Sequence, residues 1–237
     1  MNFLIVVDMQ NDFISGTLGS PHAAAIVPNV VKKVSEFDGK VIFTRDTHGP
    51  DYMSTQEGTK LPVVHCTKDT PGWEICDELK PYVQTVVDKP TFGSVNLPHM
   101  LASCGEELHQ IHLCGLCTDI CVISNAMILK AAFPEATVTV DSSCCAGVTM
   151  ESHQTALDAM KAVQIEIYLI NPLKPLKKSC IWWFFACFAI LPYVVSLDSS
   201  LMRKNKGNFF MLSLPLGRAS VRKIASFPGL RGHRCSW

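Results

Sequence analysis

The chain has 237 residues, 48% of them hydrophobic and 18% charged, which excludes an intrinsically disordered protein and predicts one substantial core. The net charge is zero, but residues 1–172 hold 10 Lys and Arg against 20 Asp and Glu, whereas residues 173–237 hold 11 basic residues and one acid, Asp198. The acidic first part argues against nucleic acid as a partner. The contrast also predicts that the two parts have different roles or origins.

Strand-like and helix-like segments alternate along residues 1–172. Short, nearly continuous apolar runs predict six strands, at Asn2–Asp8, Lys40–Arg45, Val83–Asp88, Leu108–Cys114, Thr137–Asp141 and Ile165–Ile170. Apolar residues at helical spacing predict helices at Ala23–Phe37, Trp73–Tyr82, Val95–Ser103, Asp119–Ala132 and Ser152–Ala162. This alternation predicts an α/β fold, a six-stranded, mostly parallel, Rossmann-like sheet with helices on both faces. Ligands of such sheets bind outside the carboxyl ends of the strands.

The regular pattern ends at Pro172, so we predict a folded domain over residues 1–172 and an irregular basic tail over residues 173–237. The tail contains an apolar segment, residues 181–196, which is shorter than the ~20 residues that a membrane-spanning helix needs. This segment could be a marginal transmembrane helix, or it could be sequence that was never selected to fold. We favour the second, with membrane association as the alternative, because the residues that follow show no period.

The chain contains 11 cysteines, and its first residues lack the basic segment of a signal peptide. An odd number of cysteines does not suit a disulfide scaffold, so we expect a cytoplasmic protein with reduced thiols. Cys114 and Cys117 form a CxxC pair, which leaves a thiol redox role open. Cys114 lies inside a predicted strand, however, whereas a redox pair usually opens a helix, and a structural zinc site would need a second such pair.

Polar side chains follow several predicted strands. Asp8 follows the first, Asp46 and His48 the second, Lys89 the third, and Cys121 comes shortly after the fourth. In a parallel sheet these residues gather at one edge. Cys121 also lies in the first turn of the helix predicted there, where free N–H groups and the helix dipole favour a thiolate. A carboxylate, an ammonium and a thiol together suit nucleophilic acyl transfer, with Asp8 as the base and Cys121 as the nucleophile.

Carboxylate and imidazole side chains gather in the polar segment that comprises residues 46–72. Asp46, His48, Glu57 and His65 offer oxygen and nitrogen ligands that suit Zn²⁺, Mn²⁺ or Fe²⁺ rather than Ca²⁺. Taken alone, this spacing favours solvated loop histidines, which are common in polar segments. A divalent metal site, with zinc as the first choice and manganese or iron as alternatives, becomes the favoured interpretation only together with a family resemblance carried by other segments.

Five ordered segments of the first 172 residues form a specific pattern: Val7–Phe13 (VDMQNDF), Thr44–His48 (TRDTH), His65–Cys66 with Thr70–Gly72 (HC and TPG), Lys89–Ser94 (KPTFGS) and Gly115–Val122 (GLCTDICV). In these segments the chain resembles the isochorismatase-like cysteine hydrolases, and within them the nicotinamidases and their relatives. The resemblance covers about three quarters of the chain.

The resemblance implies a catalytic triad of Asp8, Lys89 and Cys121. It also implies a non-proline cis peptide bond between Leu116 and Cys117. The backbone N–H groups of Cys117 and Cys121 would then form an oxyanion hole. True isochorismatases use no cysteine nucleophile, so Cys121 argues against that activity.

The resemblance further implies that Asp46, His48 and His65 bind the metal, with Glu57 as a fourth ligand. In nicotinamidases this metal holds the pyridine nitrogen and so positions the substrate. The implied reaction is the deamidation of nicotinamide to nicotinate and ammonia through a cysteine thioester, a step of NAD salvage. We therefore expect a small-molecule amide as the partner, while assembly into a homo-oligomer stays open.

The chain departs from the nicotinamidase pattern at the substrate ring. Many nicotinamidases carry an aromatic residue three positions before the last metal histidine, His65, and that position is Pro62 here. Phe13 remains as one aromatic wall, and Trp73 or Phe92 is the candidate for another. Hydrolysis of another small amide therefore stays open, and a catalytically inactive binding relative is the less favoured alternative.

Overall fold

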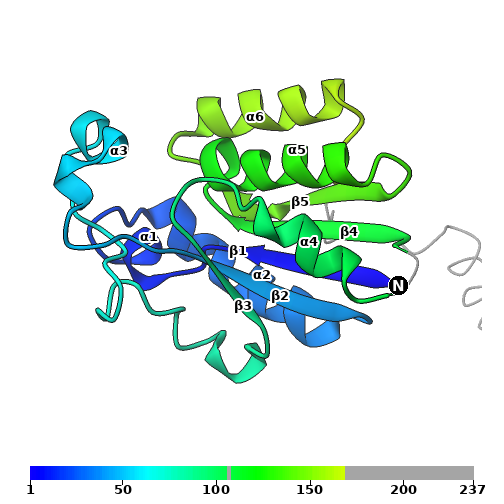
Figure 1. Cartoon of the computed structure of the whole chain (residues 1–237), viewed down its shortest axis with the longest axis horizontal. Helices are drawn as coiled ribbons and strands as arrows, with labels where there is room; N and C mark the ends of the chain where they lie inside the picture. Colours follow the sequence, from blue (N-terminus) through cyan, green and yellow to red (C-terminus); the bar gives the residue numbers. More distant parts are fainter. Residues whose placement is uncertain (106–107, 169–237) are drawn as a thin grey trace, which may run out of the picture. The chain divides into compact units, whose positions relative to one another are not determined.

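The computed structural model describes residues 1–105 and 108–168, all of which belong to the unit Met1–Lys174. Six strands form one sheet: β1 (Asn2–Val7), β2 (Lys40–Asp46), β3 (Val86–Lys89), β4 (Gln110–Leu116), β5 (Thr137–Ala146) and β6 (Glu166–Tyr168). Their order is β3-β2-β1-β4-β5-β6, and every pair is parallel (Figure 1). The predicted α/β fold is confirmed.

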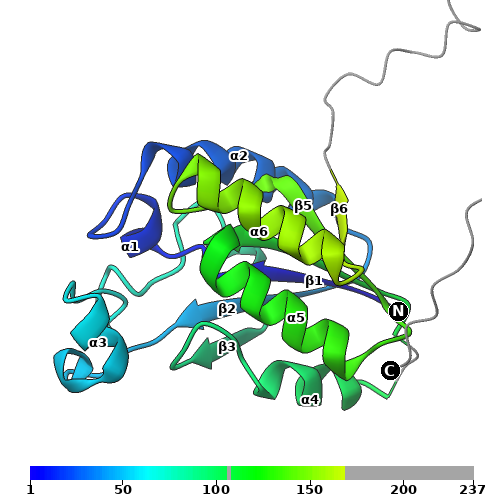
Figure 2. The ribbon, with the colours of Figure 1, turned by 90° about the horizontal axis from the view of Figure 1, so that it is seen from above.

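The helices are α1 (Asn11–Ile14), α2 (Pro21–Glu36), α3 (Gln56–Lys60), α4 (Asn96–Ala102), α5 (Ile123–Ala132) and α6 (Met150–Ala162). Helices cover both faces of the sheet, whereas α3 lies beyond the carboxyl ends of the strands (Figure 1). Helix α2 packs on one face, whereas α4, α5 and α6 lie side by side on the other, as Figure 2 shows. The buried residues of α2, spaced three and four apart, form its inner face, and the Ser20 hydroxyl caps it by accepting the N–H of Ala23.

Some predicted boundaries are wrong. Trp73–Tyr82 is not a helix but a series of turns that ends in one 3-10 turn, Lys80–Tyr82. The backbone there is tied to the segment after β1, because the N–H of Cys76 donates to Met9 and that of Asn11 donates to Glu74. These bonds to a distant segment replace the bonds that a helix would make within itself.

Other elements differ in length from the prediction. The helix predicted over residues 119–132 begins as a π-helical turn, Thr118–Val122, before α5. Strand β5 continues to Ala146, beyond the predicted end, because its ladder with β4 resumes after a bulge. Strand β3 begins only at Val86. Of the last predicted strand, Glu166–Tyr168 is described, and residues 169–170 lie outside the described residues.

The strand order determines where along the sheet a ligand site is expected. From β1 the chain proceeds outward to β2 and β3, then returns to β4 on the other side of β1 and continues to β5 and β6. The carboxyl ends of β1 and β4 therefore flank the point where the order reverses, which is where ligands bind in open α/β sheets. The two strands approach closely there: Gly115 has a φ of +116°, and a Cβ atom at this position would overlap the carbonyl of Val7.

The predicted tail, residues 173–237, and its apolar segment, residues 181–196, lie outside the described residues. Among residues 1–105 and 108–168, no helix has the length and apolar character needed to span a bilayer.

A partly buried ion pair joins α2 to the sheet. Nζ of Lys33 lies 2.8 Å from Oδ2 of Asp141 in β5, and the two side chains are 17% and 2% exposed. Burial opposes the ionisation of Asp141, but its bonds with Lys33 and Ser143 outweigh burial and hold its pKa below the usual value. The charged pair therefore stabilises the folded state.

We expect Asp141→Asn to lower the free energy of unfolding by about 1–2 kcal/mol at neutral pH, because it leaves Lys33 unpaired. A carboxyl group with a lowered folded pKa contributes stability above its unfolded pKa and loses that contribution as the pH falls through the folded pKa. Denaturant titrations should therefore show a difference between the two proteins that shrinks toward acid. Asp158→Asn, at an exposed pair with Lys161, is the matched control and should change little; a pH-independent difference would contradict the prediction.

Candidate active site

The three residues of the predicted triad meet at the carboxyl edge of the sheet. Nζ of Lys89 lies 2.7 Å from Oδ2 of Asp8 and 3.5 Å from Sγ of Cys121. The same ammonium donates to Oδ1 of Asp46 at 3.2 Å and to the carbonyl of Thr91 at 3.1 Å. Lys89 and Asp8 have fully buried side chains, and Cys121 is 4% exposed. The arrangement places an acid, a cation and a thiol in mutual contact, away from bulk water.

The end of β1 holds Asp8 in an uncommon backbone conformation. Its φ is +48°, in the left-handed region that residues other than glycine seldom occupy. Thr44 of β2 supports this conformation, because its hydroxyl donates to Oδ1 of Asp8 at 2.6 Å and its carbonyl accepts the N–H of Asp8 at 3.2 Å. One carboxylate oxygen is thus fixed by Thr44, and the other faces Lys89.

Burial sets the protonation of these groups. It raises the pKa of Asp8, although the ammonium of Lys89 opposes the shift. It also raises the pKa of the Cys121 thiol well above its ordinary value, and the adjacent Asp8 adds to this shift. Burial disfavours the charge of Lys89, but Asp8 and the acidic groups beside it outweigh burial and raise the pKa of Lys89.

The position of Cys121 in the first helical turn after β4 favours a thiolate, whereas burial opposes that charge and raises the pKa of the thiol. Attack by a protonated thiol needs a base beside it. The arrangement offers Asp8 for that role.

The turn after β4 contains the cis peptide bond that the resemblance implied. The peptide bond between Leu116 and Cys117 is cis, as predicted. Cys114, the other half of the CxxC pair, is fully buried within β4, and burial raises its pKa well above the ordinary value. A redox cysteine must meet its substrate, so the burial of Cys114 speaks against the redox interpretation of this pair.

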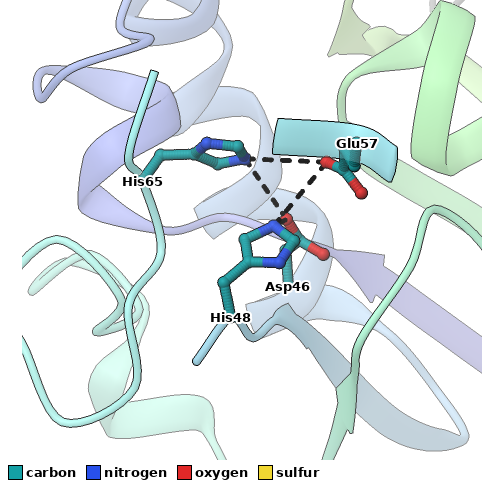
Figure 3. A group of neighbouring side chains, drawn as sticks. All are labelled: Asp46, His48, Glu57 and His65. Carbon is teal, nitrogen blue, oxygen red and sulfur yellow. Dashed lines mark ion pairs between the residues drawn. The ribbon is translucent and has the colours of Figure 1, made fainter. Parts of the chain in front are cut away.

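Figure 3 shows the four predicted metal ligands facing one another. Nε2 of His48 and Nε2 of His65 lie 2.8 and 3.6 Å from Oδ2 of Asp46, which ends β2. Oε1 of Glu57, from α3, lies 3.7 Å from the first imidazole and 4.0 Å from the second. The four ligand atoms all lie within 4.8 Å of one another, so one ion could contact every one of them.

The chemistry of this group fits a divalent metal. Nε2 of His48 is buried, and although it lies 2.8 Å from Oδ2 of Asp46 it has no hydrogen bond of regular geometry in the described part of the chain. Nδ1 of His65 lies 2.7 Å from the carbonyl of Val63 and so donates to it, which leaves Nε2 as the ligand nitrogen of the neutral ring. Burial opposes the charge of Asp46, but its two histidine neighbours outweigh burial and hold its pKa well below the usual range. Two imidazoles and two carboxyl groups suit zinc, manganese or iron.

Two supporting residues were missed from the sequence. The first is Gln10, a buried side chain that holds the end of β2. Its Nε2 donates to the carbonyls of Asp46 at 2.9 Å and of Trp73 at 2.8 Å, and its Oε1 accepts the N–H of Asp46 at 2.7 Å. Gln10 belongs to a segment that carries the resemblance, but an uncharged amide gave no separate signal of function.

The second is Tyr52, whose ring packs against both imidazoles of the metal group. Its centroid lies 4.5 Å from that of His48 and 5.1 Å from that of His65. Its hydroxyl donates to the carbonyl of Leu61 at 2.9 Å, and the residue is 1% exposed. Packing against Tyr52 therefore limits the orientations of the His48 and His65 rings.

The lining of a cavity of about 360 Å³ includes Cys121 together with three of the candidate metal ligands, Asp46, Glu57 and His65. Cys117 also lines it, and most of the remaining lining residues are apolar. Phe13 and Phe92, two of the predicted substrate-binding residues, also line it. The volume falls in the range of about 300–1,000 Å³ that is typical of small-molecule sites.

The third predicted substrate-binding residue, Trp73, lies elsewhere. It is not among the residues that line the cavity. Its indole N–H donates to Oγ1 of Thr47 at 2.8 Å, and the guanidinium of Arg45 lies 3.5 Å from the ring centroid. The ring therefore packs against the end of β2 and the loop after it, and it does not line the cavity. Tertiary packing decides between these two positions.

Comparisons with known proteins agree with this geometry. The isochorismatase domain matches residues 2–170. A nicotinamidase of Schizosaccharomyces pombe is 25% identical over 203 residues, which cover 69% of this chain and 91% of that protein. A zinc complex of Pyrococcus horikoshii pyrazinamidase superposes with a TM-score of 0.61 at 26% identity, covering 71% and 99% of the two chains. A Bacillus subtilis nicotinamidase superposes with a TM-score of 0.58 at 26% identity, covering 70% and 97%.

The parallel sheet with a thiol and an acid at its switch point thus defines a hydrolase-like α/β protein. The chain belongs to the isochorismatase family, because the family domain matches most of its length.

The four-residue group leads to a prediction about metal content. We expect the purified protein to retain a divalent metal, and His65→Ala to weaken its binding by more than about 100-fold, because the variant removes a ligand from a buried group. Elemental analysis after extensive dialysis measures this. His99→Ala, an exposed histidine of α4, is the matched control. Equal metal content in His65→Ala and the parent protein would contradict the assignment.

Proposed function

We propose that this protein deamidates nicotinamide to nicotinate and ammonia through a thioester on Cys121. The observation that carries the proposal is the contact of Lys89 with both Asp8 and Cys121, together with a cavity that is lined by Cys121 and by three of the candidate metal ligands. Hydrolysis of amide bonds as the class of reaction is supported by the family and by the nicotinamidase relatives.

The residues of the site would divide the reaction as follows. As the sulfur of Cys121 attacks the carboxamide carbon, Asp8 takes the thiol proton, which suits its raised pKa. The backbone N–H groups of Cys117 and Cys121 would stabilise the oxyanion. The carbon–nitrogen bond then breaks, and ammonia leaves with the proton that Asp8 returns. A water molecule, deprotonated by Asp8, attacks the thioester, which releases nicotinate and restores the thiol.

Lys89 would hold the charges of this sequence in place. Its ammonium contacts both Asp8 and Cys121, so it can stabilise the negative charge whether that charge lies on the carboxylate or on the sulfur. Asp46, His48, Glu57 and His65 would hold the metal. When bound there, a divalent metal supplies a Lewis acid that can bind the pyridine nitrogen and orient the ring. We infer zinc as this metal, because a relative forms a zinc complex and the donor set suits it.

A second candidate is the hydrolysis of another small amide. It is favoured by Pro62, which stands where many nicotinamidases have an aromatic residue, and by the neighbouring Leu61, which lines the cavity. Leu61, Phe92 and Val148 all line the cavity and remain 38%, 42% and 61% exposed. Such an apolar opening would accept an amide with an apolar substituent beyond the ring.

We expect metal-loaded protein to release ammonia from nicotinamide, and Cys121→Ala to reduce the rate by more than about 1,000-fold, because it removes the nucleophile. Enzyme-coupled ammonia detection measures the rate. The control variant is Cys104→Ala, which changes a thiol at the end of α4 that is absent from the lining of the cavity and should keep full activity. Release of ammonia that Cys121→Ala leaves intact would rule out the thioester route.

The two candidate substrates are separated by comparing amides. We expect nicotinamide to have the highest kcat/KM of a panel that also contains benzamide, pyrazinamide and alkyl-substituted nicotinamides. Benzamide lacks the ring nitrogen, so it should lose the contact that the metal would provide and react at least about tenfold more slowly. A substituted nicotinamide that reacts faster than the parent compound would favour the second candidate.

A further inference from the structure

A buried asparagine connects the nucleophile to the wall of the cavity. Asn125 lies in the first turn of α5 and is 0% exposed. Its Nδ2 donates to the carbonyl of Cys121 at 2.8 Å and to that of Phe92 at 3.2 Å, and its Oδ1 accepts the N–H of Ser94 at 2.9 Å. One amide group therefore binds the turn that carries the thiol and, at two points, the segment that carries Phe92.

This second segment, residues 91–94, is also held by Lys89 and by packing against α5. At one end the ammonium of Lys89 binds the carbonyl of Thr91 at 3.1 Å. Gly93 lies against α5 so closely that a Cβ atom there would come within 2.6 Å of Cδ1 of Ile128 and 3.3 Å of Cβ of Ser124. The segment is thus drawn onto α5, and Asn125 supplies the directional bonds that fix its register.

The side chain between these attachments is a wall of the cavity. Phe92 lines the cavity and is 42% exposed, so packing on its outer side does not hold it in place. Its position relative to Cys121 therefore depends on the backbone, which Asn125 binds at the carbonyl of Phe92 and at the N–H of Ser94.

We propose that Asn125 is a positioning residue that sets the distance between the Phe92 wall and the Cys121 nucleophile. The inference rests on the proposed function, since the wall matters only if a substrate ring lies against it. Cys121 is held independently by Lys89. Loss of the Asn125 contacts to the wall should therefore weaken substrate binding more than it slows the chemical step.

Steady-state kinetics on nicotinamide test this division. Asn125→Ala should raise KM about tenfold while kcat stays within about threefold. Asn125→Ser should behave in the same way, because a serine hydroxyl can still bond the carbonyl four residues earlier, that of Cys121, but is too short to replace both bonds to the other segment. This second variant keeps the test usable if the alanine variant does not fold. A fall in kcat with KM unchanged in either variant would overturn the proposal.

A matched control and a double variant identify the route of the effect. Ser124→Ala removes a helix-side bond to the carbonyl of Ile120 and leaves both segments joined, so KM should not change. If Asn125 acts through the wall, Phe92→Ala alone should raise KM, and adding Asn125→Ala should raise it little further. Fully additive increases, or an equal rise in Ser124→Ala, would show that Asn125 only stabilises the fold.

Hydrogen exchange separates failure of this inference from failure of the proposed function. The amide of Ser94 should exchange at least about tenfold faster in Asn125→Ala than in the parent protein and in Ser124→Ala, whatever the substrate. Faster exchange in a protein that cleaves no amide would disprove the proposed function but leave the connection intact. Unchanged exchange, with KM also unchanged, would disprove the connection itself.

Discussion

The buried ammonium of Lys89 is the interaction on which the rest of the site depends. It contacts the acid after β1, the carboxylate that ends β2 and the thiol after β4, and no solvent reaches it. An unpaired ammonium there would cost several kcal/mol, so its partners must stay within contact distance. Three segments far apart in the sequence are thereby held together by one charge. Because Asp46 belongs to both this cluster and the candidate metal group, the two halves of the site share an electrostatic balance.

Around this cation the site is built mainly from uncharged supports. Thr44 binds Asp8, Gln10 binds the end of β2, Tyr52 packs against the histidines, and Asn125 joins Cys121 to the segment that carries Phe92. Each is buried, and each satisfies backbone or side-chain groups that would otherwise lose hydrogen bonds on leaving water. These uncharged neighbours hold the titratable residues of the candidate site at fixed distances from one another.

The sequence was sufficient to predict the class of fold and the titratable residues of the candidate site. Asp8, Lys89 and Cys121 all stand at or after the ends of apolar strands. Because parallel strands end at the same edge of a sheet, these side chains were expected to lie close together there. Other features needed three-dimensional packing: the ring of Trp73 binds Thr47 instead of lining the cavity, its segment forms turns instead of a helix, and burial raises the pKa of the Cys121 thiol. Asn125 gave no signal, since an asparagine inside a helix pattern resembles an ordinary polar position.

The close pairing of β1 with β4 has a consequence for the order of folding. Asn2 is paired with Gln110, so the two central strands come together only after a long stretch of chain has been closed into a loop. Asp8 follows one of these strands and Cys121 the other, and Gly115 permits the close approach of the two strands. A partly folded molecule with only β1, β2 and β3 assembled would hold the acid, the ammonium and the histidines but no thiol. Recovery of catalysis during refolding would therefore report the completion of the central strand pairing, later than any spectroscopic sign of helix formation.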